Sequence, residues 1–190
     1  MGLWHVIYED WQMECCGTPF AVGDEVSRPL LFEDPDSVFG GGRHDRLTEV
    51  GGPVEEVGGV RVVRAGPGLT VALSTGLGDD DARLPERGSL FRAAGLLSVE
   101  RHGARWPEVR GRVREVQVLS QAYSETAPGS RTWQPVAGER RLRTVERCPE
   151  WFAEEETDRG RQWKESGVLA ALDVPDGAPP VRPRRAAGPS

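Results

Sequence analysis

Two adjacent cysteines, Cys15 and Cys16, are the residues whose types most directly point to chemistry. Structural zinc sites favour a Cys-x-x-Cys spacing and four ligands, which an adjacent pair does not supply. The other candidate zinc ligands occur singly along the chain, as His5, His44, His102 and Cys148. Neighbouring residues of an extended segment point to opposite faces, so we expect one thiol to pack inside and the other to face outward. No metal is predicted, and a site built from these residues is an alternative.

Nucleophilic catalysis by either cysteine would need a neighbouring base, and His44 or His102 would have to provide it. No recognisable nucleophile turn surrounds the cysteine pair. The acidic runs at 79–81 and 154–156 are typical of solvated surface, whereas general acid–base catalysis needs a buried carboxyl group. The glycine-rich segments at 40–42 and 51–52 lack the motifs that bind phosphates or dinucleotides. The sequence therefore predicts no catalytic residue and no cofactor, and a thiol-dependent activity is an alternative to simple binding.

Three arginines, Arg110, Arg112 and Arg114, alternate with apolar residues and share one face of a predicted strand. Together with Trp133 they would form a basic and aromatic surface of the kind that binds single-stranded nucleic acid. The whole chain, however, carries 24 basic and 30 acidic residues and a net charge of −6, which disfavours a polyanionic partner. We therefore predict that Trp11, Trp133 and the arginine face bind a partner that the sequence does not identify, with a protein as the first candidate. Nucleic acid is the alternative partner.

Period-two alternation of apolar residues predicts the strands that must position these side chains. The expected strands lie at 3–8, from 26 onward, at 60–64, 69–73, 96–101, 109–119, 141–147 and 168–174. Within 109–119 the alternation changes phase after Arg114, and a β-bulge near Arg114–Glu115 would keep Val113 and Val116 on the same apolar face. Phe20 and Val22 are both expected to point inward.

The segments between the strands contain loops and one helix. Glycine and proline predict long loops at 34–53 and 124–139. Pro149 at a first helical position, followed by acidic residues, predicts one short helix over 149–156. Residues 176–190 are rich in proline, alanine, arginine and glycine and carry too little apolar bulk to offset the entropy cost of ordering, so they predict a disordered tail.

Composition limits the architecture to one domain. A chain of 190 residues with 24 glycines and 15 prolines is long enough for one buried core and rich in turns. We expect a single β-rich domain over 1–175, built as a small β-barrel or β-sandwich of seven to nine strands with one short helix. Neither a secretory signal nor a membrane span is apparent. We therefore expect a cytoplasmic location, where an odd number of cysteines, three, favours free thiols over disulfides.

The segment Asp10–Val26, which reads DWQMECCGTPFAVGDEV, resembles the N-terminal signature of an uncharacterised actinomycete family, a domain of unknown function. A looser similarity extends through His102–Gly103 and the strand around Val113 to Gly167–Leu169. The resemblance covers most of the chain except the tail and implies one domain. The family carries no established activity, so the resemblance implies no function.

Overall fold

The structure is a computed structural model, and it describes residues 2–42, 44, 46–66, 68–74, 84–100, 104–158 and 160–175. Strands account for 61% of the structure and helices for 7%, which confirms the prediction of a mostly β protein. The predicted disordered tail, 176–190, lies outside the described residues. No helix in the described ranges is long and apolar enough to cross a membrane.

Eleven strands and two short helices follow one another along the described chain. The strands are β1 (Gly2–Glu9), β2 (Glu25–Arg28), β3 (Leu30–Glu33), β4 (Thr48–Val57), β5 (Val60–Arg64), β6 (Thr70–Leu73), β7 (Leu90–Val99), β8 (Val109–Glu125), β9 (Trp133–Val145), β10 (Glu154–Asp158) and β11 (Arg161–Val174). The helices are α1 (Asp10–Cys16) and α2 (Pro35–Phe39).

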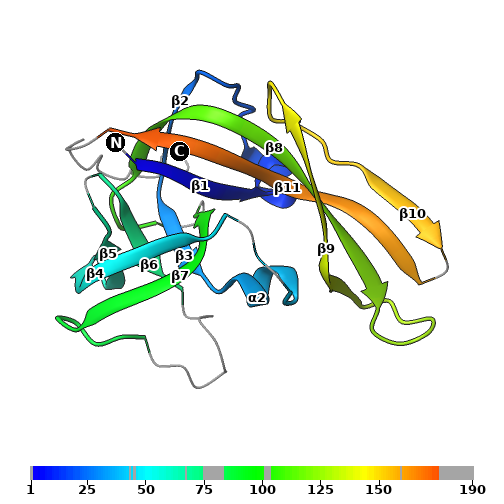
Figure 1. Ribbon diagram of the computed structural model, residues 1–190, viewed down its shortest axis with the longest axis horizontal. Coiled ribbons are helices and arrows are strands. Elements are labelled where there is room, and N and C mark those ends of the chain that lie inside the picture. Colours follow the sequence, from blue (N-terminus) through cyan, green and yellow to red (C-terminus); the bar gives the residue numbers. More distant parts are fainter. Residues whose placement is uncertain are drawn as a thin grey trace, which may run out of the picture.

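The strands are joined in the order β2-β8-β11-β1-β7-β3-β6-β5-β4, and β4 also pairs with β7. The pairings of β7, β3, β6, β5 and β4 therefore form a closed circuit. Two pairings, β1 with β7 and β3 with β6, are parallel, whereas the rest are antiparallel. Figure 1 shows this circuit at one end of the molecule, with β1, β8 and β11 running away from it.

The long strands β8 and β11 each serve two parts of the molecule. The first four residues of β8 pair with β2, whereas residues 116–125 pair with β9. Residues 167–174 of β11 pair with β1, and residues 161–164 pair with β10. Strands β9, β8, β11 and β10 thus extend beyond the body as a four-stranded arm (Figure 1).

The main core lies on one face of the long sheet, where alternate residues of β8 and β11 point inward. Val113, Val116 and Val118 of β8 are fully buried there. Because Ala171 pairs with Glu115 and Leu172 with Val113, Arg114 is an extra residue that shifts the alternation. The predicted bulge is therefore confirmed. A second apolar cluster on the opposite face includes Phe39 of α2.

Several predicted elements were wrong because non-local pairing overrides local preference. Residues 149–156 form no helix, and Glu154–Asp158 instead is β10, which pairs with β11. The expected loop at 34–53 contains α2 and the start of β4, and the expected loop at 124–139 contains the start of β9. Val22 is 41% exposed, whereas Phe20 is buried as predicted.

The segment that holds the adjacent cysteines is helical, not extended. Asp10 lies in the first turn of α1, where a negative charge interacts favourably with the helix dipole. The backbone N–H of Glu9 donates to Gln12 Oε1 at 3.3 Å, and Met13 packs into the main core. Cys15 and Cys16 are therefore neighbours in a helix. The prediction that they lie in an extended segment and point to its opposite faces was wrong.

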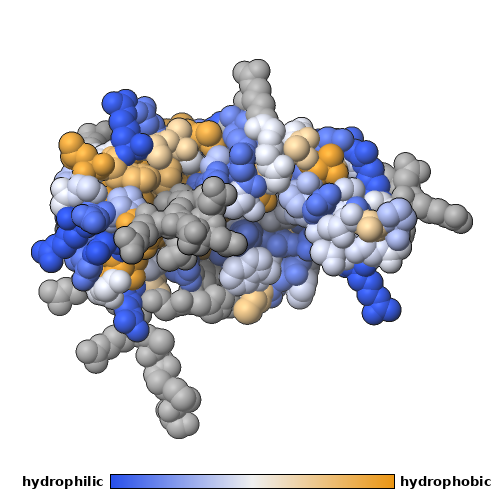
Figure 2. Space-filling view, turned by 90° about the horizontal axis from the view of Figure 1, so that it is seen from below, coloured by the Kyte–Doolittle hydropathy of each residue, from blue (hydrophilic) through white to orange (hydrophobic). Residues whose placement is uncertain are grey.

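The surface of the molecule is predominantly hydrophilic in the view of Figure 2, with apolar side chains gathered mainly over one end. Six large apolar side chains are substantially exposed among the described residues, namely Leu3, Trp11, Val22, Leu90, Leu142 and Trp151. They belong to different elements of the fold. Singly exposed apolar residues of this kind are normal for a protein surface and do not by themselves indicate a binding site.

Candidate functional site

The predicted arginine face lies on the first half of β8. Arg110, Arg112 and Arg114 are all exposed, as their alternation indicated. Arg110, however, forms an ion pair with Glu25, and Arg114 forms one with Asp173 at 2.5 Å. Arg112 forms no ion pair within the described part of the chain. Acidic neighbours on β2 and β11 therefore offset much of the positive charge on this face.

The two predicted tryptophans do not join that face. Trp133 begins β9 and pairs with Glu125, the last residue of β8. Glu125 lies eleven steps along β8 from Arg114, which corresponds to about 36 Å at 3.3 Å per residue. Trp11 lies on α1, is 44% exposed, and donates its indole N–H to Glu9 Oε2 at 2.7 Å. The predicted binding residues therefore do not form one continuous surface.

The candidate metal ligands are also dispersed. Cys15 is exposed on α1, whereas Cys148 is buried in the main core and its thiol donates to Pro149 O at 3.3 Å. His44 Nε2 lies 2.6 Å from Asp36 Oδ1. His102 and the side chain of Cys16 lie outside the described residues. Within the residues that the structure describes, no three or more His, Cys, Asp or Glu side chains are grouped to hold a metal ion.

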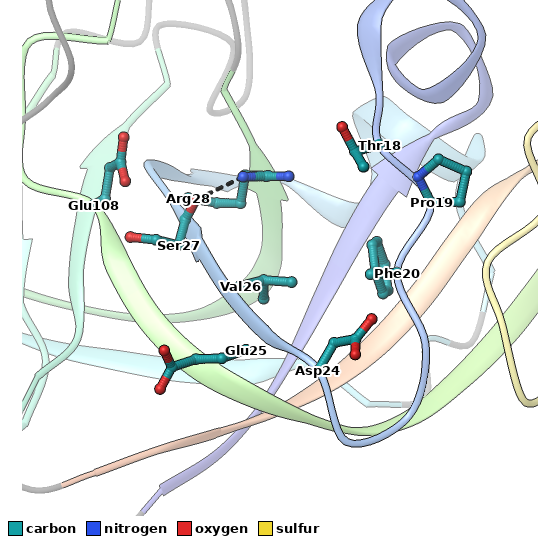
Figure 3. Close-up of a pocket in the computed structure, with 9 residues that line it drawn as sticks. All are labelled: Thr18, Pro19, Phe20, Asp24, Glu25, Val26, Ser27, Arg28 and Glu108. Carbon is teal, nitrogen blue, oxygen red and sulfur yellow. Dashed lines mark hydrogen bonds between the residues drawn. The ribbon is translucent and has the colours of Figure 1, made fainter.

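A pocket of about 470 Å³ lies along β2, the terminal strand of the sheet order. We call it the edge pocket, and Figure 3 shows its lining. The lining residues are Thr18, Pro19, Phe20, Asp24, Glu25, Val26, Ser27, Arg28 and Glu108. Sequence reasoning placed a turn and a strand here but did not identify a pocket, because no local pattern shows which edge of a strand stays unpaired.

A tight turn over Ala21–Asp24 closes one end of the edge pocket. The Asp24 N–H donates to Ala21 O at 3.1 Å, and the Ala21 N–H donates to Asp24 Oδ2 at 2.8 Å. Gly23 has φ +94°, which glycine adopts without strain. Beyond the turn the two legs diverge, since Phe20 O accepts from Cys148 N–H at 2.8 Å while β2 pairs with β8. The space between the legs is the pocket.

The edge pocket combines one guanidinium with three carboxylates. Arg28 Nη1 donates to Ser27 O at 2.8 Å, and the guanidinium points across the pocket toward Thr18 (Figure 3). Arg28 Nε and Ser27 Oγ are both buried and make no hydrogen bond within the described residues. Glu25 is paired with Arg110, whereas Asp24 and Glu108 add negative charge to the rim. The pocket therefore offers a directed donor beside an acidic rim.

A second group of polar side chains surrounds Lys164, the only lysine in the sequence. Its Nζ lies 2.8 Å from Asp10 Oδ2 and 3.3 Å from Glu154 Oε1. Glu9, Tyr123 and Ser166 line the same cavity of about 100 Å³. We call these residues the Lys164 cluster, and it connects α1 to strands β8, β10 and β11 of the arm.

Burial and ion pairing shift the pKa values in the Lys164 cluster. Loss of hydration raises the pKa of the Glu9 carboxyl group and of the Tyr123 phenol. The hydrogen bond to Asp10 raises the pKa of Lys164 and keeps its ammonium group charged. The cavity is smaller than ordinary ligand pockets, which measure roughly 300–1,000 Å³. The cluster is therefore better suited to holding structural elements together than to binding a ligand.

Comparison with known proteins gives one match. The model of a family of unknown function, DUF6578, matches residues 2–174. No curated protein and no solved structure is significantly similar to the chain.

Proposed function

The chain belongs to DUF6578, a family of unknown function, and on that premise we propose from its own geometry that it is a non-enzymatic binding module. The ligand site in this proposal is the edge pocket. The observation that carries it is the pair of buried polar groups, Arg28 Nε and Ser27 Oγ, that make no hydrogen bond within the described residues.

Unsatisfied buried polar groups are costly, and a ligand offers a way to satisfy them. A buried donor without an acceptor costs about 1–3 kcal/mol, and more when it is charged. A ligand oxygen that reaches Arg28 Nε, after a small shift of the side chains that cover it, would recover this energy. The contact between Arg28 Nη1 and Ser27 O holds the guanidinium in place before binding, which reduces the entropy cost of ordering it. The pocket volume of about 470 Å³ lies in the usual range for small ligands.

The composition of the lining supports binding over catalysis. None of the nine lining residues is a histidine, the side chain that most often acts as general base near neutral pH, so Thr18 and Ser27 have no imidazole in the lining to activate them as nucleophiles. Its carboxylates lie at the rim of the pocket and not in an apolar enclosure of the kind that prepares a carboxyl group for acid–base catalysis. We further propose that the closed circuit of β7, β3, β6, β5 and β4 is a small barrel, and that the protein acts in the cytoplasm.

Nucleic-acid binding by the arginine face is less well supported. The ion pairs of Arg110 and Arg114 oppose the release of counterions that drives such binding. Salt-sensitive binding of a random single-stranded oligonucleotide, lost in an Arg112→Gln variant, would favour this function over the edge pocket.

Fragment screening by NMR tests the proposed function with chemically simple probes. A library of small carboxylates, amides and amines is titrated into the ¹⁵N-labelled protein. We expect the bound fragments to shift backbone signals of residues 18–28 and 108. Arg28→Gln should weaken the binding of amide fragments, whose carbonyl oxygen can accept from Arg28 without adding negative charge beside the acidic rim, about tenfold or more, because one charge-assisted hydrogen bond is lost.

Arg92→Gln is the matched control, since Arg92 is an exposed arginine on β7 that pairs with Glu49. It should leave the affinities unchanged. The proposal fails if no fragment perturbs the edge pocket, or if both substitutions weaken binding equally.

A further inference from the structure

The hydrogen bonds of β2 show which of its backbone groups face the edge pocket. Val113 N–H donates to Asp24 O at 2.8 Å, and the register then pairs Val26 with Gly111 and Arg28 with Val109. In an antiparallel ladder, alternate residues direct both backbone groups at the partner strand. Val26 and Arg28 therefore bond to β8, whereas Glu25 and Ser27 direct their N–H and C=O groups away from it.

The outward groups form an unpaired strand edge beside the pocket. Among the described strands, β2 pairs only with β8. Arg28 Nη1 donates to the outward carbonyl of Ser27 at 2.8 Å, in agreement with this direction. The N–H and C=O of Glu25 and the N–H of Ser27 make no hydrogen bond to any other residue that the structure describes. Such an edge is a template on which another extended chain can form main-chain hydrogen bonds.

We propose that the ligand of the edge pocket is a short extended segment of a partner protein that adds a strand to β2, an inference that rests on the proposed function. Main-chain bonds to Glu25 and Ser27 would hold the segment in register. Four residues of β2 extend over about 13 Å, which three or four residues of a ligand strand would match. The closed turn at Ala21–Asp24 limits how far the segment extends at that end.

The side chains around the edge define the chemistry of the segment. Glu25 is balanced by Arg110, so Asp24 and Glu108 leave an excess of negative charge over Arg28. This charge favours a basic residue in the segment. Phe20 and Val26 face each other across the floor of the pocket (Figure 3). Because side chains of a strand alternate between faces, an apolar residue next to the basic one would meet this floor.

Two synthetic pentapeptide pools, blocked at both ends, test the inference. One pool has arginine at its centre, the other has glutamate, and the remaining positions are random. We expect the arginine pool to shift the amide signals of Glu25 and Ser27 and to slow hydrogen exchange of the Ser27 N–H. The glutamate pool should bind about tenfold more weakly or not at all.

Ser27→Pro removes the outward N–H without removing a bond to β8, and proline is tolerated at such edge positions. This substitution should weaken binding of the arginine pool about tenfold, because one main-chain hydrogen bond to the peptide is lost. Ser27→Ala keeps the N–H and removes only the hydroxyl group, so it should weaken binding of the arginine pool much less than Ser27→Pro does. If Ser27→Pro is not folded by circular dichroism, protection of the Ser27 N–H in the native protein decides the question.

The outcomes separate this inference from the proposed function. Suppose that small fragments bind at Arg28 but neither peptide pool shifts the signals of Glu25 and Ser27. The inference of a peptide ligand is then wrong, whereas the proposed function of the edge pocket is supported. Equal binding of both pools would overturn the charge preference. Protection of the same two amides by dimerisation, detected by light scattering without peptide, would replace the partner segment with a second copy of this chain.

Discussion

The Lys164 cluster allows one stability prediction to be worked out in detail. The ammonium group of Lys164 binds the carboxylate of Asp10, whose side chain is only 14% exposed, and the carboxylate of Glu154, which is 61% exposed. The Glu154 contact resembles a surface pair, worth about 0.2–1 kcal/mol. The Asp10 contact is a charge-assisted hydrogen bond in a partly buried place, worth about 1.5–3 kcal/mol. Lys164→Met should therefore lower the free energy of unfolding by about 2–3 kcal/mol.

Urea unfolding followed by circular dichroism measures this change, provided that the slope against denaturant stays constant. A loss of 2–3 kcal/mol corresponds to about 4–12 °C in melting temperature for a chain of this length. In a double-mutant cycle, Asp10→Asn combined with Lys164→Met should show a coupling energy of about 1–2 kcal/mol. Much of the cost of the single substitution comes from leaving the Asp10 carboxylate without its partner.

Arg92→Met provides the control, because Arg92 and Glu49 form a pair at 2.5 Å whose side chains are 80% and 60% exposed. It should cost no more than about 0.5 kcal/mol. The reasoning is refuted if Lys164→Met and Arg92→Met destabilise the protein equally, since burial of Asp10 would then have no effect.

Two further predictions concern the same region. Gly167 has φ +141°, and a Cβ there would lie 2.1 Å from Tyr8 O. Gly167→Ala should therefore lower the free energy of unfolding in urea by about 3 kcal/mol or more, whereas Gly129→Ala, which has open space around it, should lower it by about 1 kcal/mol. Equal costs would show that β1 and β11 can separate. Burial raises the pKa of Glu9, so its stabilising contribution is present below the unfolded-state pKa and is lost as pH rises through the folded-state pKa. Glu9→Gln should therefore gain stability relative to the native protein as the pH rises above the ordinary pKa of glutamate. Thermal unfolding at a series of pH values measures this gain, and a difference that does not change with pH would contradict the cause.

Local patterns predicted the elements whose faces are determined by neighbouring residues. Strands β5 and β6, which pair with each other, follow from two apolar runs on either side of a glycine-rich turn. The bulge at Arg114 follows from the change of phase in β8, because both Val113 and Val116 must reach the core. The exposure of the three arginines was predicted by the same alternation. Their ion pairs could not be predicted, since Glu25 and Asp173 belong to other strands.

The elements that were missed depend on partners distant in sequence. Glu154–Asp158 has a plausible helical pattern, yet β11 offers it a strand edge and the backbone pairs there. Trp133 was predicted as a binding residue beside the arginines, but β8 is so long that the two lie at opposite ends of it. Neither the length of β8 nor the pairing of β10 is visible in a local window.

The sequence alone determined that this protein is mostly β and which residues of its clearest strands point inward, because period-two alternation is a local property of the chain. The tertiary structure decided where a ligand has room to bind. The edge pocket exists because β8 pairs with one edge of β2 while the segment at 18–20 is held away by Cys148. The Lys164 cluster brings Asp10 to Lys164, more than one hundred residues along the chain. Such contacts are set by the order of strands in the sheet, which no single segment encodes.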